Sequence, residues 1–390
     1  MINLRRSKFP IVILVGMTYS ILTVAQEVSV FRSGEDGYAS YRIPAIVKNK
    51  SGELIAFTEG RVDHSGDFGN VDIVYKTSKD GKSWGRLHVA VDYRDLQAGN
   101  AAPVVDRLDR RFPDGRIFLF YNTGNNHEQA VRQGNGLREA WYITSEDGGL
   151  TWSKPVNITT QVHRPRQPQI NSAYHFVEDW RTYANTPGHG FQFVSGPNKG
   201  RIYIAANHNQ GDPKQDNTDW NAHGYYSDDH GATFSLSENV PYPGTNESQA
   251  AQISENVVYM TSRNQRTTPR QRVISISQDG GHSWVSSAPD PNLPDPVNQA
   301  SVLSWKGGRE FILAHLNAAD ENHRNNLTLR LSRDGGKTWF YNKLIARAPD
   351  GYQGAYSAYS DMVLMRKKVI GILYEKHNYS EIVFRELKLE

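Results

Sequence analysis

The chain has 390 residues, of which 38% are hydrophobic and 22% are charged, a composition typical of a globular protein with one large or two smaller domains. Its formal charge of +3 comes from residues 1–25, which hold three basic and no acidic residues, so the rest of the chain is neutral. A neutral chain excludes nucleic acid and anionic membranes as partners bound through net charge, and the absence of cysteine excludes disulfides, thiol catalysis and cysteine-ligated metals.

The first segment predicts an export signal. Basic residues at positions 5, 6 and 8 precede an apolar run over 9–24, which ends at the small residue Ala25. The run is too short and too polar for a membrane anchor but typical of a secretory leader. We therefore expect a signal peptide over 1–25, a single domain over 27–390 without a membrane span, and a periplasmic or secreted location.

Short alternating segments separated by Gly, Asp, Asn and Pro follow along the whole chain and predict strands. In chain order these segments are Val28–Phe31, Leu54–Thr58, Ile73–Thr77, Ile117–Tyr121, Ala140–Thr144, Ile202–Ala206, Val257–Thr261, Val273–Ser277, Leu327–Ser332, Val369–Tyr374 and Ile382–Leu387. Because no long stretch has an apolar period of 3.6 residues, the fold class is all-β. Four longer irregular stretches, 124–138, 162–188, 207–221 and 289–298, are expected to be loops that build or cover a site.

One turn motif occurs five times, over 78–84, 145–152, 227–234, 277–284 and 332–339. Its full pattern is Ser-x-Asp-x-Gly-x-Thr/Ser-Trp/Phe, and the first copy is one residue shorter. The Asp accepts backbone N–H groups of its own turn, the Gly permits a positive φ, and the aromatic residue packs inward. We interpret the motif as structural. Intervals of roughly 50 to 80 residues between copies suit four-stranded blades, so we expect a β-propeller.

Arg-Ile-Pro at residues 42–44 adds a second signal. Ser262-Arg263-Asn264, His323-Arg324-Asn325 and Leu373-Tyr374-Glu375 follow it in the chain. In this order the motifs resemble the sialidase family, from about residue 31 to the carboxyl terminus. The resemblance implies a six-bladed propeller in which Arg42, Arg263 and Arg324 bind a substrate carboxylate and Glu375 orients the first of them. Arginine suits this task because its planar fork of donors matches a carboxylate and always carries charge.

The same resemblance assigns the catalytic residues. It implies Tyr359 as nucleophile, Glu247 as its base and Asp67 as the acid that protonates the leaving oxygen, with Asp63 as the nearby alternative. A phenol suits a sugar whose anomeric carbon bears a carboxylate, because an anionic nucleophile would be repelled there, and a tyrosine nucleophile is an established property of sialidases. Arg61 and Asn100 stand where some relatives contact the sugar's 4-substituent, although several relatives have Asp at the second position.

The resemblance therefore implies a retaining exo-sialidase that acts on sialylated glycans through a covalent tyrosyl intermediate. A transferase or an anhydro-forming enzyme would use the same residues, and a glycan-binding propeller without activity would share the turn motif. The histidines have no metal-binding spacing and the Asp-Gly pairs lack the later ligands of an EF-hand, so we expect no catalytic metal and no cofactor. The sequence carries no signal for an oligomeric state.

Overall fold

The computed structural model describes residues 27–389, and the expected signal peptide lies outside them. Strands dominate this part of the chain, and its two helices are short, α1 (Glu128–Arg132) and α2 (Thr159–Val162). The prediction of an all-β fold is confirmed. Within 27–389, neither helix is long and apolar enough to cross a membrane.

The strands form five sheets, in which neighbouring strands are antiparallel except at one bridge. In four of these sheets, four strands lie side by side. The first of the four contains β10 (Trp180–Asn185), β12 (Ile202–Gln210), β13 (Trp220–Ser227) and β14 (Ser235–Leu236), with β11 (Phe191–Gln192) beside β12. The second contains β15 (Thr245–Gln252), β16 (Val258–Asn264), β17 (Gln271–Ser277) and β18 (Ser286–Pro294). The third contains β19 (Ser301–Gly307), β20 (Glu310–Ala318), β21 (Leu327–Ser332) and β22 (Tyr341–Ala346).

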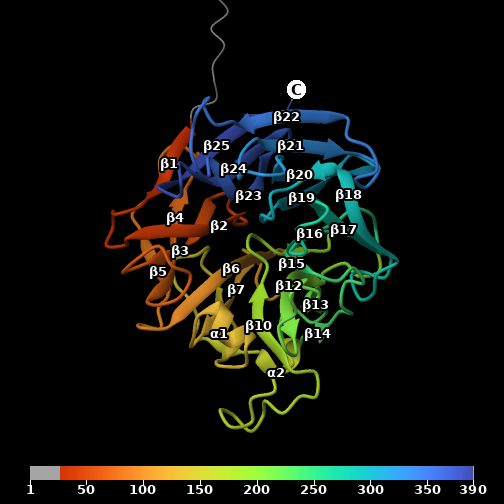
Figure 1. Ribbon diagram of the computed structural model, residues 1–390. Coiled ribbons are helices and arrows are strands. Elements are labelled where there is room, and N and C mark those ends of the chain that lie inside the picture. Colours follow the sequence, from red (N-terminus) through yellow and green to blue (C-terminus); the bar gives the residue numbers. More distant parts are fainter. Residues whose placement is uncertain (1–26, 390) are drawn as a thin grey trace, which may run out of the picture.

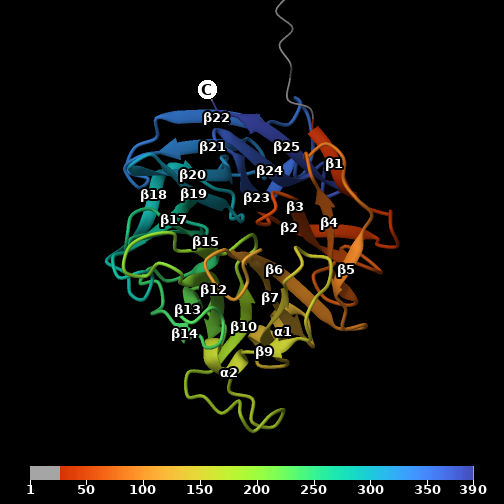
Figure 2. The same cartoon turned by 180° about the vertical axis from the view of Figure 1, so that it is seen from behind.

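The fourth sheet joins the two ends of the described chain. It contains β23 (Ser357–Arg366), β24 (Val369–Lys376), β25 (Glu381–Lys388) and, as its outer strand, β1 (Glu27–Arg32). Figures 1 and 2 show β1 beside the carboxyl-terminal strands, so the sheets close into a ring. Pairing of the first strand with the last three ties the ring together without a disulfide.

The fifth sheet has eight strands: β2 (Ser40–Lys48), β3 (Leu54–Arg61), β4 (Val71–Ser78), β5 (His88–Val91), β6 (Gln97–Asp106), β7 (Arg116–Gly124), β8 (Arg138–Ser145) and β9 (Val156–Asn157). A single parallel bridge between Val71 and Gln97 connects its first four strands to its last four. The sheets surround a common centre (Figure 1), and the predicted β-propeller is confirmed. Only four sheets stand as separate four-stranded blades, whereas the sequence predicted six.

The repeated turn motif has the expected structural role. In each copy the Asp carboxylate accepts backbone N–H groups of its own turn at 2.8–3.1 Å, and in the shorter first copy these groups lie two and three residues after the Asp. Each copy connects the third strand of a four-strand unit to the fourth. The closing aromatic residue packs on a neighbouring unit or strand, as Trp84 does on Phe384 with ring centroids 5.4 Å apart. These carboxylates are therefore occupied by their own turns.

All eleven predicted strands are present, but the sequence patterns missed the strands nearest the centre. The missed inner strands are β2, β6, β10, β15, β19 and β23. Apart from β19, they are almost wholly buried and yet contain polar residues where they begin, as in Asn246-Glu247-Ser248-Gln249 of β15. Polar residues at one end and apolar residues at the other give no alternation, so a pattern based on period 2 fails there.

All four expected loops contain regular structure, and the stretch 207–221 includes the end of β12 and the beginning of β13. The stretch 162–188 includes β10, the stretch 289–298 begins inside β18, and the stretch 124–138 contains α1. The stretch 289–298 contains four prolines, which argued against a strand. β18 is the outermost strand of its sheet, where missing N–H groups do not interrupt a ladder.

Three histidines lie in the core between β10, β12 and β13. His163, His208 and His223 are each at most 1% exposed, and the ring of His208 stacks on Trp180 with centroids 3.6 Å apart. Burial lowers the pKa of His223 to about 3 and the pKa values of His163 and His208 well below the usual range. In the described part of the chain no carboxylate forms an ion pair with them. They are therefore neutral in the folded protein.

We expect acid to destabilise the fold through these histidines. Below about pH 6.5 each histidine binds a proton in the unfolded chain but not in the folded chain. The free energy of unfolding therefore has its full value above that pH and falls by about 1.4 kcal/mol per histidine for each pH unit below it. Urea unfolding at about pH 7.5 and about pH 5.5 measures the difference. His208→Phe should reduce the pH dependence by about one proton, whereas the exposed His175→Phe should not. Equal pH dependence in both variants would contradict this explanation.

Candidate active site

Inner strands and the segments beside them place the predicted site residues around one cavity. The cavity has a volume of about 230 Å³ and lies where β2, β6, β15 and β23 begin, next to the ends of β3 and β16. Eight of the nine predicted residues line it, namely Arg42, Arg61, Asp67, Asn100, Glu247, Arg263, Arg324 and Tyr359. The ninth, Glu375, lies fully buried beneath them. Residues that are up to 317 positions apart in the sequence thus meet in a single site.

Tyr359, Glu247 and Arg263 form a connected group. The Tyr359 hydroxyl lies 2.6 Å and 2.7 Å from the two carboxylate oxygens of Glu247 and donates its hydrogen to that carboxylate. Arg263 Nη1 donates to Glu247 Oε2 at 2.7 Å and to the Tyr359 hydroxyl at 2.9 Å. The phenol therefore has an adjacent base, which is the arrangement that an oxygen nucleophile with a high pKa requires.

The electrostatics of this group keep the phenol neutral in the free protein. Burial and the Glu247 carboxylate raise the pKa of Tyr359, while Arg263 and Arg324 act in the opposite direction. Burial opposes the charge of Arg263, but Tyr359 and Glu247 raise its pKa above the usual value. The guanidinium is thus charged in the site, and Glu247 provides its counter-charge.

Glu375 holds two parts of the site at once. Its Oε1 accepts from Arg42 Nε at 2.7 Å and from the backbone N–H of Ile43 at 2.9 Å, and its Oε2 accepts from the backbone N–H of Tyr359 at 3.1 Å. Ile43 has a φ of 61°, an uncommon backbone conformation for a β-branched residue. The register of β2 shifts at this point, and the bond to Glu375 holds the strained residue that turns Arg42 into the cavity.

Asp67 reaches the cavity from the loop after β3. Its side chain is 78% exposed, and its Oδ1 lies 2.8 Å from Arg61 Nη2. Arg61 is buried, and its guanidinium also pairs with Glu59 and donates to the backbone carbonyl of Ser65. The alternative acid, Asp63, is not among the described residues that line the cavity. Arg61 thus positions Asp67. The contacts of Arg61 and Asn100 with a sugar stay predictions.

Sequence reasoning missed Tyr379. Its ring lies under the guanidinium of Arg42, 4.0 Å from the ring centroid, and its hydroxyl accepts from Arg324 Nη1 at 3.0 Å. Tyr379 stands in the turn after β24, four residues after Glu375, where three consecutive residues have φ values of 51°, 54° and 65°. The sequence offered one signal for Tyr379: it stands in the turn that follows Glu375, the predicted orienting acid. Tyr379 connects two arginines that would otherwise repel each other.

Several polar residues that line the cavity also went unnoticed in the sequence. They are Glu59, Gln97, Glu128, Arg138, Asn207 and Gln265. None belongs to a motif with recognisable spacing, and they come from separate elements that only the closed ring brings together. Their donors and acceptors give the cavity the capacity to bind a highly hydroxylated ligand.

We expect Tyr379→Phe to weaken substrate binding more than catalysis. The change removes the acceptor for Arg324 but keeps the ring under Arg42, and a hydrogen bond to a charged group contributes about 1.5–3 kcal/mol, so KM should rise by roughly tenfold. Steady-state kinetics on an aryl sialoside measures KM and kcat separately. Tyr226→Phe is the matched control, because that ring also lies under an arginine, Arg201, but far from the cavity. An unchanged KM in Tyr379→Phe would remove Tyr379 from the site.

One group of side chains has the composition of a metal site. Ligand atoms of Asp106, Asp109 and His230 lie within 4.8 Å of one another. His230 already pairs with Asp106, and Arg111 binds both oxygens of Asp109. These acceptors already form hydrogen bonds and ion pairs, so we interpret the group as a structural network at the carboxyl end of β6.

Known proteins share these features. A family model described as a BNR repeat-like domain matches residues 52–373. A sialidase of Micromonospora viridifaciens is 30% identical over 88% of this chain and 51% of its own length, so the chain spans about half of that relative. An exo-alpha-sialidase of Aspergillus fumigatus is 27% identical over 90% of this chain and 85% of its own length.

Solved structures share the fold. A Hadza microbial sialidase superposes with a TM-score of 0.76 at 24% identity, over 93% of this chain and 68% of its own. A leech intramolecular trans-sialidase superposes with a TM-score of 0.70 at 14% identity, over 94% of this chain and 70% of its own. At these identities the structures establish the fold alone. The family match and the curated relatives show that the chain belongs to the sialidase family with BNR repeats.

Proposed function

We propose that the protein is a retaining exo-sialidase that removes terminal sialic acids from glycans through a covalent intermediate on Tyr359. The observation that carries the proposal is the contact of the Tyr359 hydroxyl with both oxygens of Glu247, at 2.6 Å and 2.7 Å, next to three arginines. A site that only binds a glycan needs no phenol paired with a base.

Three guanidiniums provide the binding energy for a carboxylate sugar. Arg42, Arg263 and Arg324 line the same cavity, and the first and third lie 5.5 Å and 5.4 Å from the centroid of the Tyr359 ring. A carboxylate bound among them would place the anomeric carbon, to which it is attached, over the phenol. Arginine forks bind carboxylates through paired, charge-assisted hydrogen bonds, so the sugar would be held in one orientation.

The reaction then needs two proton transfers. As the Tyr359 oxygen forms a bond to the anomeric carbon, Glu247 takes the phenol proton, and Asp67 gives a proton to the glycosidic oxygen as its bond to that carbon breaks. The products of this step are a tyrosyl glycoside, whose phenol proton is now on Glu247, and the aglycone, which leaves as a neutral alcohol. Water, activated by Asp67, then attacks the anomeric carbon, and Tyr359 recovers its proton from Glu247.

Asp67→Ala tests the assignment of the acid. We expect natural sialosides with poor leaving groups to lose roughly 10²–10⁴ in rate, while activated aryl sialosides lose far less because their leaving groups need little protonation. Steady-state rates on both substrate types measure the difference. Asp63→Ala is the matched control on the same loop and should leave both rates near those of the unchanged protein. Equal losses on both substrates would reopen the choice of acid.

Product analysis separates the alternatives. A hydrolase releases free sialic acid from an aryl sialoside, an anhydro-forming enzyme releases a product in which the sugar's own hydroxyl has attacked the anomeric carbon, and a transferase gives a new sialoside when an acceptor glycan is added. A glycan-binding propeller releases nothing. We expect free sialic acid, and absence of release would contradict the proposed function.

Two further features belong to this proposal. We infer six blades, because the eight-stranded sheet consists of the two units β2–β5 and β6–β9, each with one copy of the turn motif and with a single bridge between them. We also propose export, on the basis of the signal-like segment over 1–25. Cleavage after Ala25, measured by mass spectrometry of the secreted protein, tests the second inference.

A further inference from the structure

A second, larger cavity lies at the other end of the inner strands. Its volume is about 660 Å³, and its lining comes from the carboxyl-terminal halves of β2, β6, β15, β19 and β23, with residues of β11. The beginnings of β2, β6, β15 and β23 line the candidate active site, so the two cavities lie at opposite ends of these four strands. We name the larger one the rear cavity.

A network around Asp361 separates the two cavities. Asp361 is fully buried, and its carboxylate accepts from the backbone N–H groups of Ile46 and His189, at 2.8 Å and 3.0 Å. It also accepts from Gln249 Nε2 at 3.0 Å, and Gln249 Oε1 accepts from the backbone N–H of Val302 at 2.6 Å. Residues of β2, β15, β19 and β23 are thus tied together at mid-axis, so a ligand of the rear cavity would not enter the active site.

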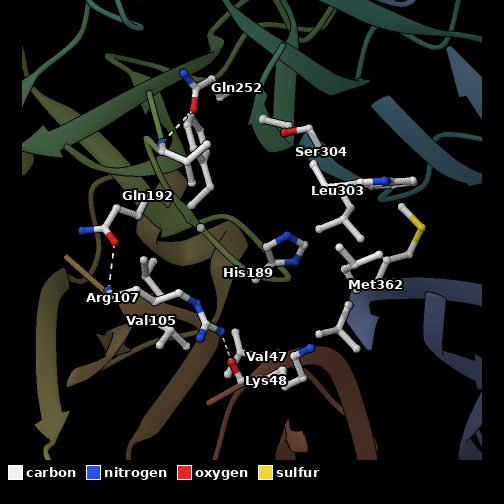
Figure 3. A pocket seen from close by; sticks show the side chains of 18 of the residues that line it. Val47, Lys48, Val105, Arg107, His189, Gln192, Gln252, Leu303, Ser304 and Met362 are labelled. Atoms are coloured by element: carbon white, nitrogen blue, oxygen red, sulfur yellow. Dashed lines mark hydrogen bonds between the residues drawn. The ribbon is translucent and has the colours of Figure 1, made fainter. Parts of the chain in front are cut away.

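The wall of the rear cavity is mainly apolar. Val47, Val105, Leu303 and Met362 line it from separate strands (Figure 3). Monomeric proteins usually fill such a space with their own side chains, and an apolar cavity of several hundred cubic ångströms is the common setting of a small-molecule site.

The charges of the rear cavity all have one sign. Lys48, Arg107 and Lys306 line it, and none of the described residues that line it carries a carboxylate. Lys48 Nζ and Arg107 Nη2 reach only backbone carbonyls, those of Met365 and Lys48. Burial and the nearby Arg107 lower the pKa of Lys48, as expected for two cations that lack a counter-charge. Lys48 is half-buried and Arg107 is exposed, and no carboxylate among the described lining residues pairs with them, so both can bind an added anion.

We propose that the rear cavity binds an amphipathic anion, namely a carboxylate on an unbranched alkyl chain, with its head group at Lys48 and Arg107. Figure 3 places these two side chains together on one side of the cavity, with Leu303 and Met362 across from them. The alkyl chain lies against this apolar side. The site is independent of the proposed sialidase reaction, because none of its residues takes part in the active site.

Calorimetry with three compounds that share a decyl chain tests the charge requirement. We expect decanoate to bind in a one-to-one complex, and decanol and decyltrimethylammonium to bind at least tenfold more weakly. The unchanged full-length protein is used for all three. Equal affinity for the three compounds would overturn the proposed anion recognition, and absence of decanoate binding would overturn the site itself.

Two sets of variants test the location. Lys48→Gln with Arg107→Gln should weaken decanoate binding at least tenfold, whereas the control Lys337→Gln with Lys343→Gln removes the same charge from a turn and a strand outside the cavity lining and should not. Ser304→Asp places a carboxylate in the wall at a partly exposed position and should favour decyltrimethylammonium over decanoate. Unchanged preference in Ser304→Asp would overturn the location. Hydrolysis of an aryl sialoside should stay unchanged in all these variants, so this proposal and the proposed function fail separately.

Discussion

Replacing Glu375 with glutamine is expected to cause the largest combined loss of stability and activity. The carboxylate is fully buried and accepts from Arg42, Ile43 and Tyr359, and an amide offers only one acceptor oxygen for these three donors. The change also leaves Arg42 without its counter-charge, and breaking a buried ion pair on one side costs about 3–5 kcal/mol. Urea unfolding measures the stability, and kinetics on an aryl sialoside measures the activity.

A surface ion pair provides the matched control. Glu386 pairs with Arg366 at 2.6 Å, but the two side chains are 31% and 61% exposed. Glu386→Gln should therefore change the free energy of unfolding by less than about 1 kcal/mol and leave kcat/KM unchanged. If Glu375→Gln behaved like Glu386→Gln, Glu375 would not hold the arginine and the tyrosine in place.

Glu247→Gln is expected to give the largest loss of catalysis. It removes the base that takes the proton of Tyr359, and loss of a general base lowers kcat by roughly 10²–10⁴. It also removes the counter-charge of Arg263, whose Nη1 lies 2.7 Å from Glu247 Oε2, so some loss of stability accompanies the loss of rate. Single-turnover kinetics separates the chemical step from substrate binding.

A double variant shows whether the two residues act as one unit. Tyr359→Phe and Glu247→Gln should each remove the same step, so the double variant should lose about as much activity as either single variant. The distances of 2.6 Å and 2.7 Å between the phenol and the carboxylate oxygens predict this coupling. Losses that multiply would mean that the two residues serve separate steps.

Much of the fold could be predicted because its repeats are local. The Asp of each turn motif binds backbone groups only two to four residues away, so the motif is complete in the sequence. Most middle strands have apolar residues on regular spacing and were also predicted, whereas the outermost strands β5, β9, β14, β18 and β22 were not. The inner strands were missed because their beginnings line a polar cavity, as Glu247 and Tyr359 do, and their apolar patterns are interrupted there.

The site was predicted only where short motifs surround its residues. Arg42, Glu247 and Tyr359 each stand in a recognisable tripeptide or tetrapeptide, whereas Tyr379 stands in a turn that the motifs do not include. Tyr379 acts through its distance to two arginines, 4.0 Å to Arg42 and 3.0 Å to Arg324, and such a distance depends on ring closure rather than on spacing in the chain. The rear cavity was missed for the same reason, because it exists only between strands of different sheets.

Trapping of the covalent intermediate tests the central claim most directly. A sialosyl fluoride with a second fluorine next to the anomeric carbon should form a stable adduct, because that fluorine slows both steps while the good leaving group keeps formation faster than breakdown. We predict that peptide mapping by mass spectrometry finds the adduct on Tyr359, and that Glu247→Gln slows its formation strongly. An adduct on Glu247, or no adduct on a protein that demonstrably cleaves sialosides, would contradict the account.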